Sequence, residues 1–278
     1  DDLLGRPERR LYSCTPGNCT TSAADGSFSI PNDWPRYRWR ARAWAEGFAP
    51  AYSAEVQGSA AGIELELSAG GTLAGELRLA GSNPAGIRLS AHRGDKLESS
   101  RCQVGRRIHV LTQADGSYRL PHLEPGPWLL APELSPGALQ ALGWSAKDGE
   151  LARATPFVLS VTEGRETLAN LDLRQPGGSC RLRGTLTVGD QIRAGYAYLL
   201  LPGEHPIRVA SCGVAEGGRF ELATRAPGTY RLVVHAGPGH YEFRLVTDLV
   251  TLVDGEQSWE RSLTPDQWKE EGVRLDPE

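Results

Sequence analysis

The sequence predicts an all-β protein built from tandem Greek-key β-sandwich domains. Three observations predict this fold: a Gly-containing turn followed by an alternating strand occurs three times, Pro-Gly turns precede further alternating strands, and Gly-Gly turns separate the repeats. The chain has 278 residues, 40% of them hydrophobic. At roughly 100–200 residues for each domain, this length predicts two or three domains.

The first repeated element is a turn with the strand that follows it. It reads ADGSFSI at 24–30, ADGSYRL at 114–120 and, more weakly, EGGRFEL at 216–222. In each copy an aromatic and an aliphatic residue occupy alternate positions after the turn, as in a half-buried strand. The phrase therefore predicts a hairpin at the same place in three domains.

The second repeated element is a strand that begins near a Pro-Gly turn. The copies read PHLEPGPWLL at 121–130 and APGTYRLVV at 226–234, and YRWRARA at 37–43 takes the matching place in the first repeat. In the 37–43 strand, aromatic and alanine residues alternate with arginines, which indicates one buried and one solvated face. Trp39 and Trp128 fall at core-facing positions and are predicted to lie in the cores.

Gly-Gly turns place the boundaries near Ala69 and Pro176. An alternating segment that is expected to be a closing strand ends before each turn, at 62–67 and at 168–173, and a new strand begins after it. The predicted units are an incomplete N-terminal sandwich (1–68), a complete sandwich (69–176), a C-terminal sandwich (177–264) and a polar tail (265–278). The second unit carries an insertion at 133–153, for which a short helix or a packed loop is expected.

The first unit lacks the opening strands that the other two units have, and residues 1–10 are charged without strand alternation. Two hypotheses account for this: proteolysis removed the N-terminus, or a partner chain supplies the missing strands, as in donor-strand assembly. The chain contains no methionine, which favours a processed or trimmed product.

Charge and motifs argue against several classes of function. The net charge of −4 argues against nucleic-acid binding, and no apolar stretch is long enough to span a membrane. The sequence has no HExxH, GxSxG, Walker or GxGxxG motif, and its six histidines are scattered. We therefore predict no enzymatic activity, no metal and no cofactor. Asp25 and Asp115 are assigned to turns, because the oxygen-rich spacing of a calcium loop is missing.

The five cysteines predict disulfides in an exported protein, since none forms a CxxC pair. Cys14 and Cys19 bracket a TPGN turn and are expected to close a small loop. Cys180 and Cys212 are expected on neighbouring strands of the C-terminal sandwich and are predicted to form a second disulfide. Cys102 is then unpaired or bonded to another chain.

Three tryptophans, Trp34, Trp144 and Trp268, fall in loop-like segments and form a candidate interface for a protein or a glycan. The alternative is that each loop packs onto its own domain. The tripeptide Arg93-Gly94-Asp95 matches a cell-attachment motif in a predicted hairpin loop, but such a tripeptide arises readily by chance in a chain rich in arginine and glycine.

Residues 113–130, QADGSYRLPHLEPGPWLL, together with the opening GGTLAG at 70–75, resemble the carboxypeptidase regulatory-like domain family, whose modules are similar to transthyretin-like and Cna-B-like sandwiches. The resemblance covers 69–173, more loosely 178–263, and the first unit only from its turn onward. It implies a two-sheet, prealbumin-like Greek-key sandwich with a non-catalytic role. Some Cna-B-like domains form Lys–Asn isopeptide bonds; the three lysines here predict none.

The leading functional hypothesis is an exported structural or adhesive protein of a bacterial cell surface, the periplasm or a secreted assembly, such as a filament or appendage subunit. Such a protein has a protein partner or associates with itself. The first alternative is a carbohydrate- or protein-binding module that uses the loop tryptophans, and the second is a non-catalytic fragment of a larger exported hydrolase.

Overall fold

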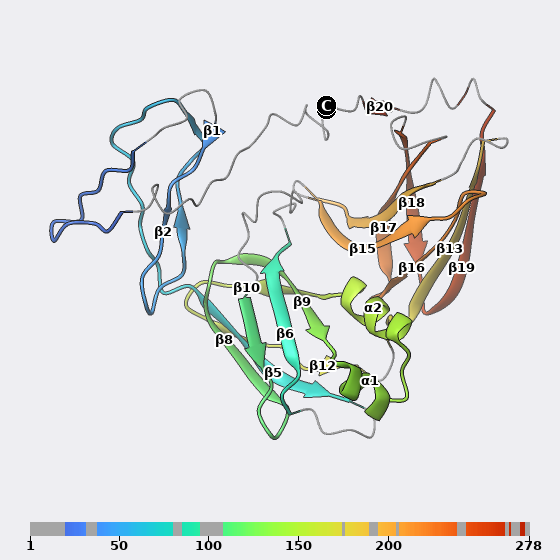
Figure 1. Ribbon diagram of the computed structural model, residues 1–278, viewed down its shortest axis with the longest axis horizontal. Coiled ribbons are helices and arrows are strands. Elements are labelled where there is room, and N and C mark those ends of the chain that lie inside the picture. Colours follow the sequence, from blue (N-terminus) through green and yellow to red (C-terminus); the bar gives the residue numbers. More distant parts are fainter. Residues whose placement is uncertain are drawn as a thin grey trace.

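The computed structural model describes residues 20–31, 38–79, 85–94, 108–173, 176–188, 194–203, 206–237, 243–264, 267 and 273–275 (Figure 1). Strands dominate this part of the chain, and the buried apolar side chains form two separate hydrophobic cores. Each core lies between two sheets. The predicted all-β sandwich fold is therefore confirmed.

The core of the middle sandwich lies between the sheet β10-β9-β6-β7 and the sheet in which β5 pairs with β8 on one side and with β11 and β12 on the other. Its strands are β5 (Gly71–Arg78), β6 (Arg88–Arg93), β7 (Ile108–Leu111), β8 (Ser117–Leu123), β9 (Gly126–Glu133), β10 (Phe157–Val161), β11 (Glu166–Leu168) and β12 (Leu171–Asp172).

The C-terminal sandwich places its core between the sheets β16-β13-β19 and β15-β14-β17-β18-β20. Its strands are β13 (Cys180–Thr187), β14 (Ala194–Leu201), β15 (Ile207–Val214), β16 (Arg219–Thr224), β17 (Gly228–Gly237), β18 (Phe243–Leu252) and β19 (Gly255–Ser262), and the tail adds β20 (Val273–Leu275).

The two sandwiches have the same strand order. The opening strand is central in its sheet. In the middle sandwich, β5 pairs antiparallel with β8, the strand after the Gly turn, and parallel with the closing strands β11 and β12. In the C-terminal sandwich, β13 pairs in the same way with β16 and with the closing strand β19. The other sheet has the order β7-β6-β9-β10 in one sandwich and β15-β14-β17-β18 in the other. The repeat seen in the sequence is thus a repeat of topology.

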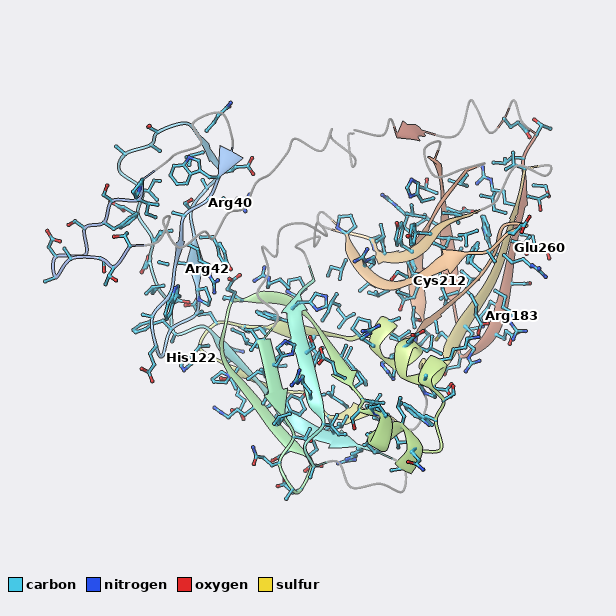
Figure 2. All side chains as sticks on the ribbon, in the orientation of Figure 1. Arg40, Arg42, His122, Arg183, Cys212 and Glu260 are labelled. Carbon is cyan, nitrogen blue, oxygen red and sulfur yellow. The ribbon has the colours of Figure 1, made fainter. Side chains whose placement is uncertain are left out.

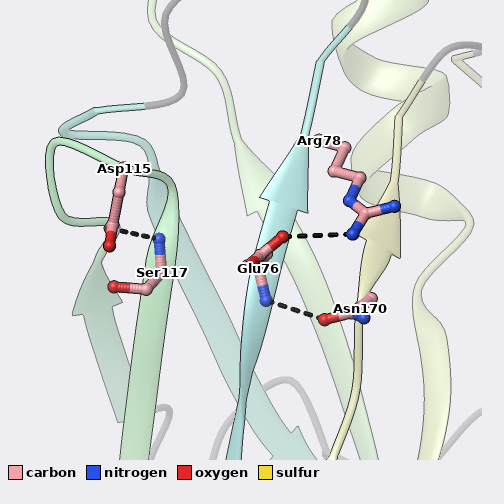
Figure 3. A network of polar contacts seen from close by, with 5 residues as sticks. All are labelled: Glu76, Arg78, Asp115, Ser117 and Asn170. Atoms are coloured by element: carbon pink, nitrogen blue, oxygen red, sulfur yellow. Dashed lines mark hydrogen bonds and ion pairs between the residues drawn. The ribbon is translucent and has the colours of Figure 1, made fainter.

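The Gly turn has the same backbone hydrogen bonds in all three copies. In the second copy, Gln113 O accepts from Gly116 N at 3.0 Å, and Gln113 N donates to Ser117 O at 2.8 Å. The equivalent bonds join Ala23 with Gly26 and Ser27, and Ala215 with Gly218 and Arg219. Asp115 Oδ1 also accepts from Ser117 N at 2.9 Å, as Figure 3 shows. Hydrogen bonds from Ser117 lower the pKa of Asp115, so turn chemistry accounts for this aspartate.

The closing strand of the middle sandwich is interrupted at Ala169 and Asn170, between β11 and β12. The Ala169 carbonyl accepts from the hydroxyl of Tyr118 at 2.5 Å. Asn170 Oδ1 accepts from Glu76 N at 3.1 Å, as Figure 3 shows. A Cβ on Gly75 would lie 2.2 Å from Ala169 O, so the two backbones approach closely here.

A ring-to-backbone hydrogen bond recurs after each Pro-Gly turn. Tyr230 donates from its hydroxyl to Ala226 O at 2.6 Å, and Trp128 donates from Nε1 to Glu124 O at 2.8 Å, in both cases four residues upstream. Trp128 is 4% exposed and belongs to the middle core, as predicted. The bond fixes the first residues of β9 and β17 against their turns.

Replacing Tyr230 with phenylalanine is expected to lower the free energy of unfolding by about 1 kcal/mol, because it removes one hydrogen bond and keeps the buried ring. Urea denaturation followed by circular dichroism measures the change. Tyr196→Phe serves as the control, since Tyr196 is 56% exposed. Equal stability of the two variants would contradict a stabilising role for this bond.

The described residues of the first unit form short strands, and none of them belongs to either core. β1 (Arg38–Trp39) pairs with β4 (Val56–Gln57), and β2 (Arg42–Ala43) pairs with β3 (Ala51–Tyr52), so the strand expected at 37–43 is one arm of an interrupted antiparallel hairpin. Trp39 is half-buried and donates from Nε1 to Gly58 O at 2.7 Å. The strand expected at 62–67 does not form.

The insertion between β9 and β10 forms two helices, α1 (Pro136–Ala141) and α2 (Ala146–Ala154), where the sequence predicted a short helix or a loop. Ser135 and Ser145 cap their N-termini. Ser145 and Asp148 form a capping box, and hydrogen bonds from Ser145 lower the pKa of Asp148. The serine caps divide the apolar stretch into two helices.

Candidate functional site: the junction between the two sandwiches

The junction between the middle and C-terminal sandwiches is centred on α2, which packs against β9 and also contacts β15 (Figure 1). Among the buried apolar residues that belong to neither core are Leu129, Ala131, Ala152 and Ala223. Leu129 and Ala131 lie on the face of β9 opposite the core residues Trp128 and Leu130. Strand β9 is therefore buried on both faces.

Leu151 of α2 fits against the start of the C-terminal sandwich. A Cβ on Gly177 would lie 2.7 Å from Leu151 Cδ2 and 3.2 Å from Ala223 Cβ, so a glycine lets these side chains close over the backbone. The Gly-Gly turn that marked the boundary in the sequence thus also permits close packing. A second contact lies at Gly94, where a Cβ would be 2.9 Å from Ile207 Cγ2 at the start of β15.

Arg225, just after β16, joins the two sandwiches through polar contacts. Its guanidinium donates from Nε to Thr155 O at 2.8 Å and from Nη2 to Pro176 O at 3.1 Å and Ala152 O at 3.5 Å. Thr155 is the C-cap of α2. The last carbonyls of a helix lack partners within the helix and favour a nearby cation, so Arg225 completes the C-terminus of α2.

The Arg225 guanidinium also lies over the ring of Phe157, 4.2 Å from its centroid. Burial lowers the pKa of Arg225 to about 10, and the charge of Asp172 opposes that shift. The group therefore stays charged at neutral pH. No feature of the sequence singled out Arg225, because its partners are main-chain carbonyls distant along the chain.

Of the three tryptophans that the sequence predicts to form an interface, only Trp144 is among the described residues. This side chain is half-buried and packs against the middle core, which agrees with the alternative of a loop packed onto its own domain. Trp34 and Trp268 lie outside the described residues. Within the described residues, Trp44 has the most exposed indole, at 72%.

Cys180 and Cys212 are free thiols in this structure, and the disulfide predicted between them stays a prediction. Cys180 lies on β13, whose neighbours are β16 and β19, while Cys212 lies on β15, which pairs with β14 in the opposite sheet (Figure 2 labels Cys212). The two strands are thus not neighbours. Burial raises the pKa of Cys212 to about 11. Cys14, Cys19 and Cys102 lie outside the described residues.

Arg93 of the Arg-Gly-Asp tripeptide has a structural role. Its Nη1 lies 3.4 Å from Glu124 Oε2, and the same nitrogen donates to Pro125 O. Both charged side chains are about one-eighth exposed, at 13% for Arg93 and 14% for Glu124. Asp95 lies outside the described residues.

The described residues contain no group of three or more His, Cys, Asp or Glu side chains that could hold a metal ion. In the same part of the chain, no helix is both long enough and apolar enough to cross a membrane. The one lysine that this part includes, Lys147, is exposed on α2.

Comparisons with known proteins find only solved structures of low similarity. No family model and no curated protein matches the chain. A streptococcal ancillary pilin shares 12% identity at a TM-score of 0.28, covering 83% of this chain and 76% of the pilin. The shaft pilin SpaA from Lactobacillus rhamnosus GG shares 9% identity at a TM-score of 0.27, covering 70% of this chain and 98% of the pilin.

The Bacillus anthracis TIE protein shares 13% identity at a TM-score of 0.25, covering 82% of this chain, which spans 41% of that protein. TM-scores this low do not establish a shared function. The resemblance to the carboxypeptidase regulatory-like domain family accordingly stays a prediction.

Proposed function

We propose that this chain is a non-enzymatic structural or adhesive protein of a bacterial surface or extracellular assembly, in which the two complete sandwiches act together as a rigid spacer. The observation that carries this proposal is the junction, where the apolar contact of Leu151 and the hydrogen bonds of the Arg225 guanidinium join the two sandwiches. A spacer that projects a binding surface must keep its length and direction, so its joints are the functional part.

Domains joined by a linker move relative to one another unless their interface is large and hydrophobic. Here the interface is closed by Leu151, Ala152 and Ala223, and Arg225 bonds to carbonyls on the other side of it. Opening the junction therefore exposes apolar surface and breaks charge-assisted hydrogen bonds together.

Small-angle X-ray scattering of the purified chain tests the rigid spacer. The scattering of the wild type is expected to fit one fixed arrangement of the two sandwiches. Leu151→Asp is expected to broaden the distance distribution, because a carboxylate would be buried against Gly177 and Ala223.

Leu168→Asp is the matched control, since Leu168 on β11 is 77% exposed and far less costly to replace. A wild type that fits only an ensemble of arrangements would rule out the rigid spacer. An unchanged profile for Leu151→Asp would show that this contact does not hold the junction.

A further inference from the structure

The outer face of the five-stranded sheet of the C-terminal sandwich carries exposed aromatic and apolar side chains. The core residues of β14 include Ala197 and Leu199. The residues that alternate with them, and therefore face away from the core, are Tyr196, Tyr198 and Leu200. Tyr196 is 56% exposed, and Leu249, on the outer face of β18, is 64% exposed.

Two arginines flank Leu200 on this face. Leu200 is in register with Arg208 of β15 on one side and with Arg231 of β17 on the other. The Arg208 guanidinium lies over the Tyr198 ring, 5.7 Å from its centroid. Burial raises the pKa of Tyr198, the charge of Arg208 lowers it and Tyr196 raises it, so these three side chains form one cluster.

The opposite sheet, β16-β13-β19, pairs its outward arginines with acids. Arg183 lies 2.5 Å from a carboxylate oxygen of Glu256 and 3.9 Å from one of Glu221, and Arg181 lies 3.8 Å from Glu221. Within the part of the chain that the structure describes, Arg208 and Arg231 have no such carboxylate partner. The face around Leu200 is therefore complementary in charge to an anionic ligand.

The backbone of this face has no hydrogen bonds to offer a ligand. Strand β14 pairs with β15 and β17, and β17 pairs with β14 and β18, so both strands use their main-chain groups within the sheet. A peptide lying across the face would leave its own amides without partners. A glycan has no such amide backbone, and its hydroxyls find donors and acceptors in tyrosine hydroxyls and guanidinium groups.

The Tyr196 ring has an open flank. Its partner in register on β15 is Gly213, and a Cβ there would come no closer than 4.0 Å to any neighbour. The glycine thus leaves room beside the tyrosine ring for a flat ligand to stack on it.

The size of this area favours a narrow ligand over a folded protein. At about 3.3 Å per residue and about 4.8 Å between strands, the area from Tyr196 to Leu200 and from β15 to β18 measures roughly 13 by 14 Å. A stable protein interface buries about 800 Å² on each partner, several times as much. A short stretch of glycan running along β14 fits within this area.

We propose that this face is a binding site for an acidic glycan that carries uronate groups. The residues of the site are Tyr196, Tyr198, Leu200, Arg208, Arg231 and Leu249. The glycan lies along β14 and stacks on the two tyrosine rings, and its carboxylates accept hydrogen bonds from the planar guanidiniums of Arg208 and Arg231. The site shares no residue with the junction and does not depend on the rigid spacer.

Isothermal titration calorimetry of the full chain with a mannuronate hexamer tests the site. The matched control is the methyl ester of the same hexamer, which keeps the sugar rings and loses the charges. We expect the acid to bind at least about tenfold more tightly than the ester, because the ester forms no charge-assisted hydrogen bonds with the guanidiniums. Equal binding of the two, or no binding of the acid at millimolar concentration, would overturn the proposal.

Variants of the chain locate the binding. Arg231→Gln and Tyr196→Ser are each expected to weaken it about tenfold or more, whereas Tyr196→Phe, which keeps the ring, is expected to stay within about threefold of the wild type. Arg183→Gln on the opposite sheet is the control and is expected to bind like the wild type. Unchanged affinity in Arg231→Gln, or an equal loss in Arg183→Gln, would contradict the site.

Two other occupants would give different results. If hexaglutamate bound as tightly as the mannuronate hexamer, the arginines would belong to a site for an acidic peptide. If sedimentation at rising protein concentration showed a dimer that Tyr196→Ser abolishes, a second copy of the chain would cover the face. Either result would refute the glycan site.

Discussion

Replacing Arg225 with alanine is expected to uncouple the two sandwiches and to lower the free energy of unfolding by about 3 kcal/mol. The guanidinium donates to Thr155 O and Pro176 O and lies over Phe157. Alanine leaves these carbonyls without their charged donor and opens a space beside the ring. In differential scanning calorimetry, we expect the wild type to unfold in one transition and Arg225→Ala in two.

Two further variants sharpen this experiment. Arg219→Ala removes an exposed arginine from β16 and is expected to unfold like the wild type. Arg225→Lys keeps the charge but not the planar fork of donors, so an intermediate loss is expected. If Arg225→Ala and Arg219→Ala behaved alike, the Arg225 contacts would not stabilise the junction.

Replacing Gly184 with alanine is expected to unfold the C-terminal sandwich or to destabilise it by more than about 3 kcal/mol. The new methyl group would lie 2.0 Å from the Phe220 ring, which is buried in the core. The ring has little room to move, since it packs against Trp259 at a centroid distance of 5.8 Å. Trp259 is held in turn by a 3.0 Å hydrogen bond to Asp248.

Urea denaturation of Gly184→Ala measures this effect, with Gly213→Ala on β15 as the control. A Cβ on Gly213 would come no closer than 4.0 Å to any neighbour, so that variant is expected to stay within about 1 kcal/mol of the wild type. The double variant Gly184→Ala/Phe220→Ala is expected to lose much less stability than the sum of the two single losses, because without the Phe220 ring the new methyl group has nothing to collide with. Additive losses would contradict a direct contact.

The sequence predicts the repeating hairpins well because their signals are local. A glycine that must adopt a positive φ, as Gly26 and Gly116 do, and the strand alternation after it are readable over a few residues. Trp128 was assigned correctly to a core on the same basis. These signals fix the identity and direction of each strand without any knowledge of its partners.

Which sheet a strand joins, and which strands it pairs with there, is harder to predict from the sequence. Cys180 and Cys212 each lie at a sensible position on a strand, but alternation does not say which of the two sheets a strand joins, and β15 lies in the sheet opposite β13. The junction is hidden for a related reason. Arg225 bonds to backbone carbonyls 49 to 73 residues away in sequence, and every residue type carries such a carbonyl.

The parallel pairing of the first and last strands gives each sandwich a characteristic response to mechanical load. In the C-terminal sandwich, β13 and β19 run side by side in register from Cys180 and Gly255 to Thr187 and Ser262. A force that pulls on the two ends of the sandwich therefore acts along these strands, and the hydrogen bonds between them bear it in shear, all at once rather than one after another. Tension on the chain is resisted by the whole ladder, which suits a protein that is stretched between two attachment points.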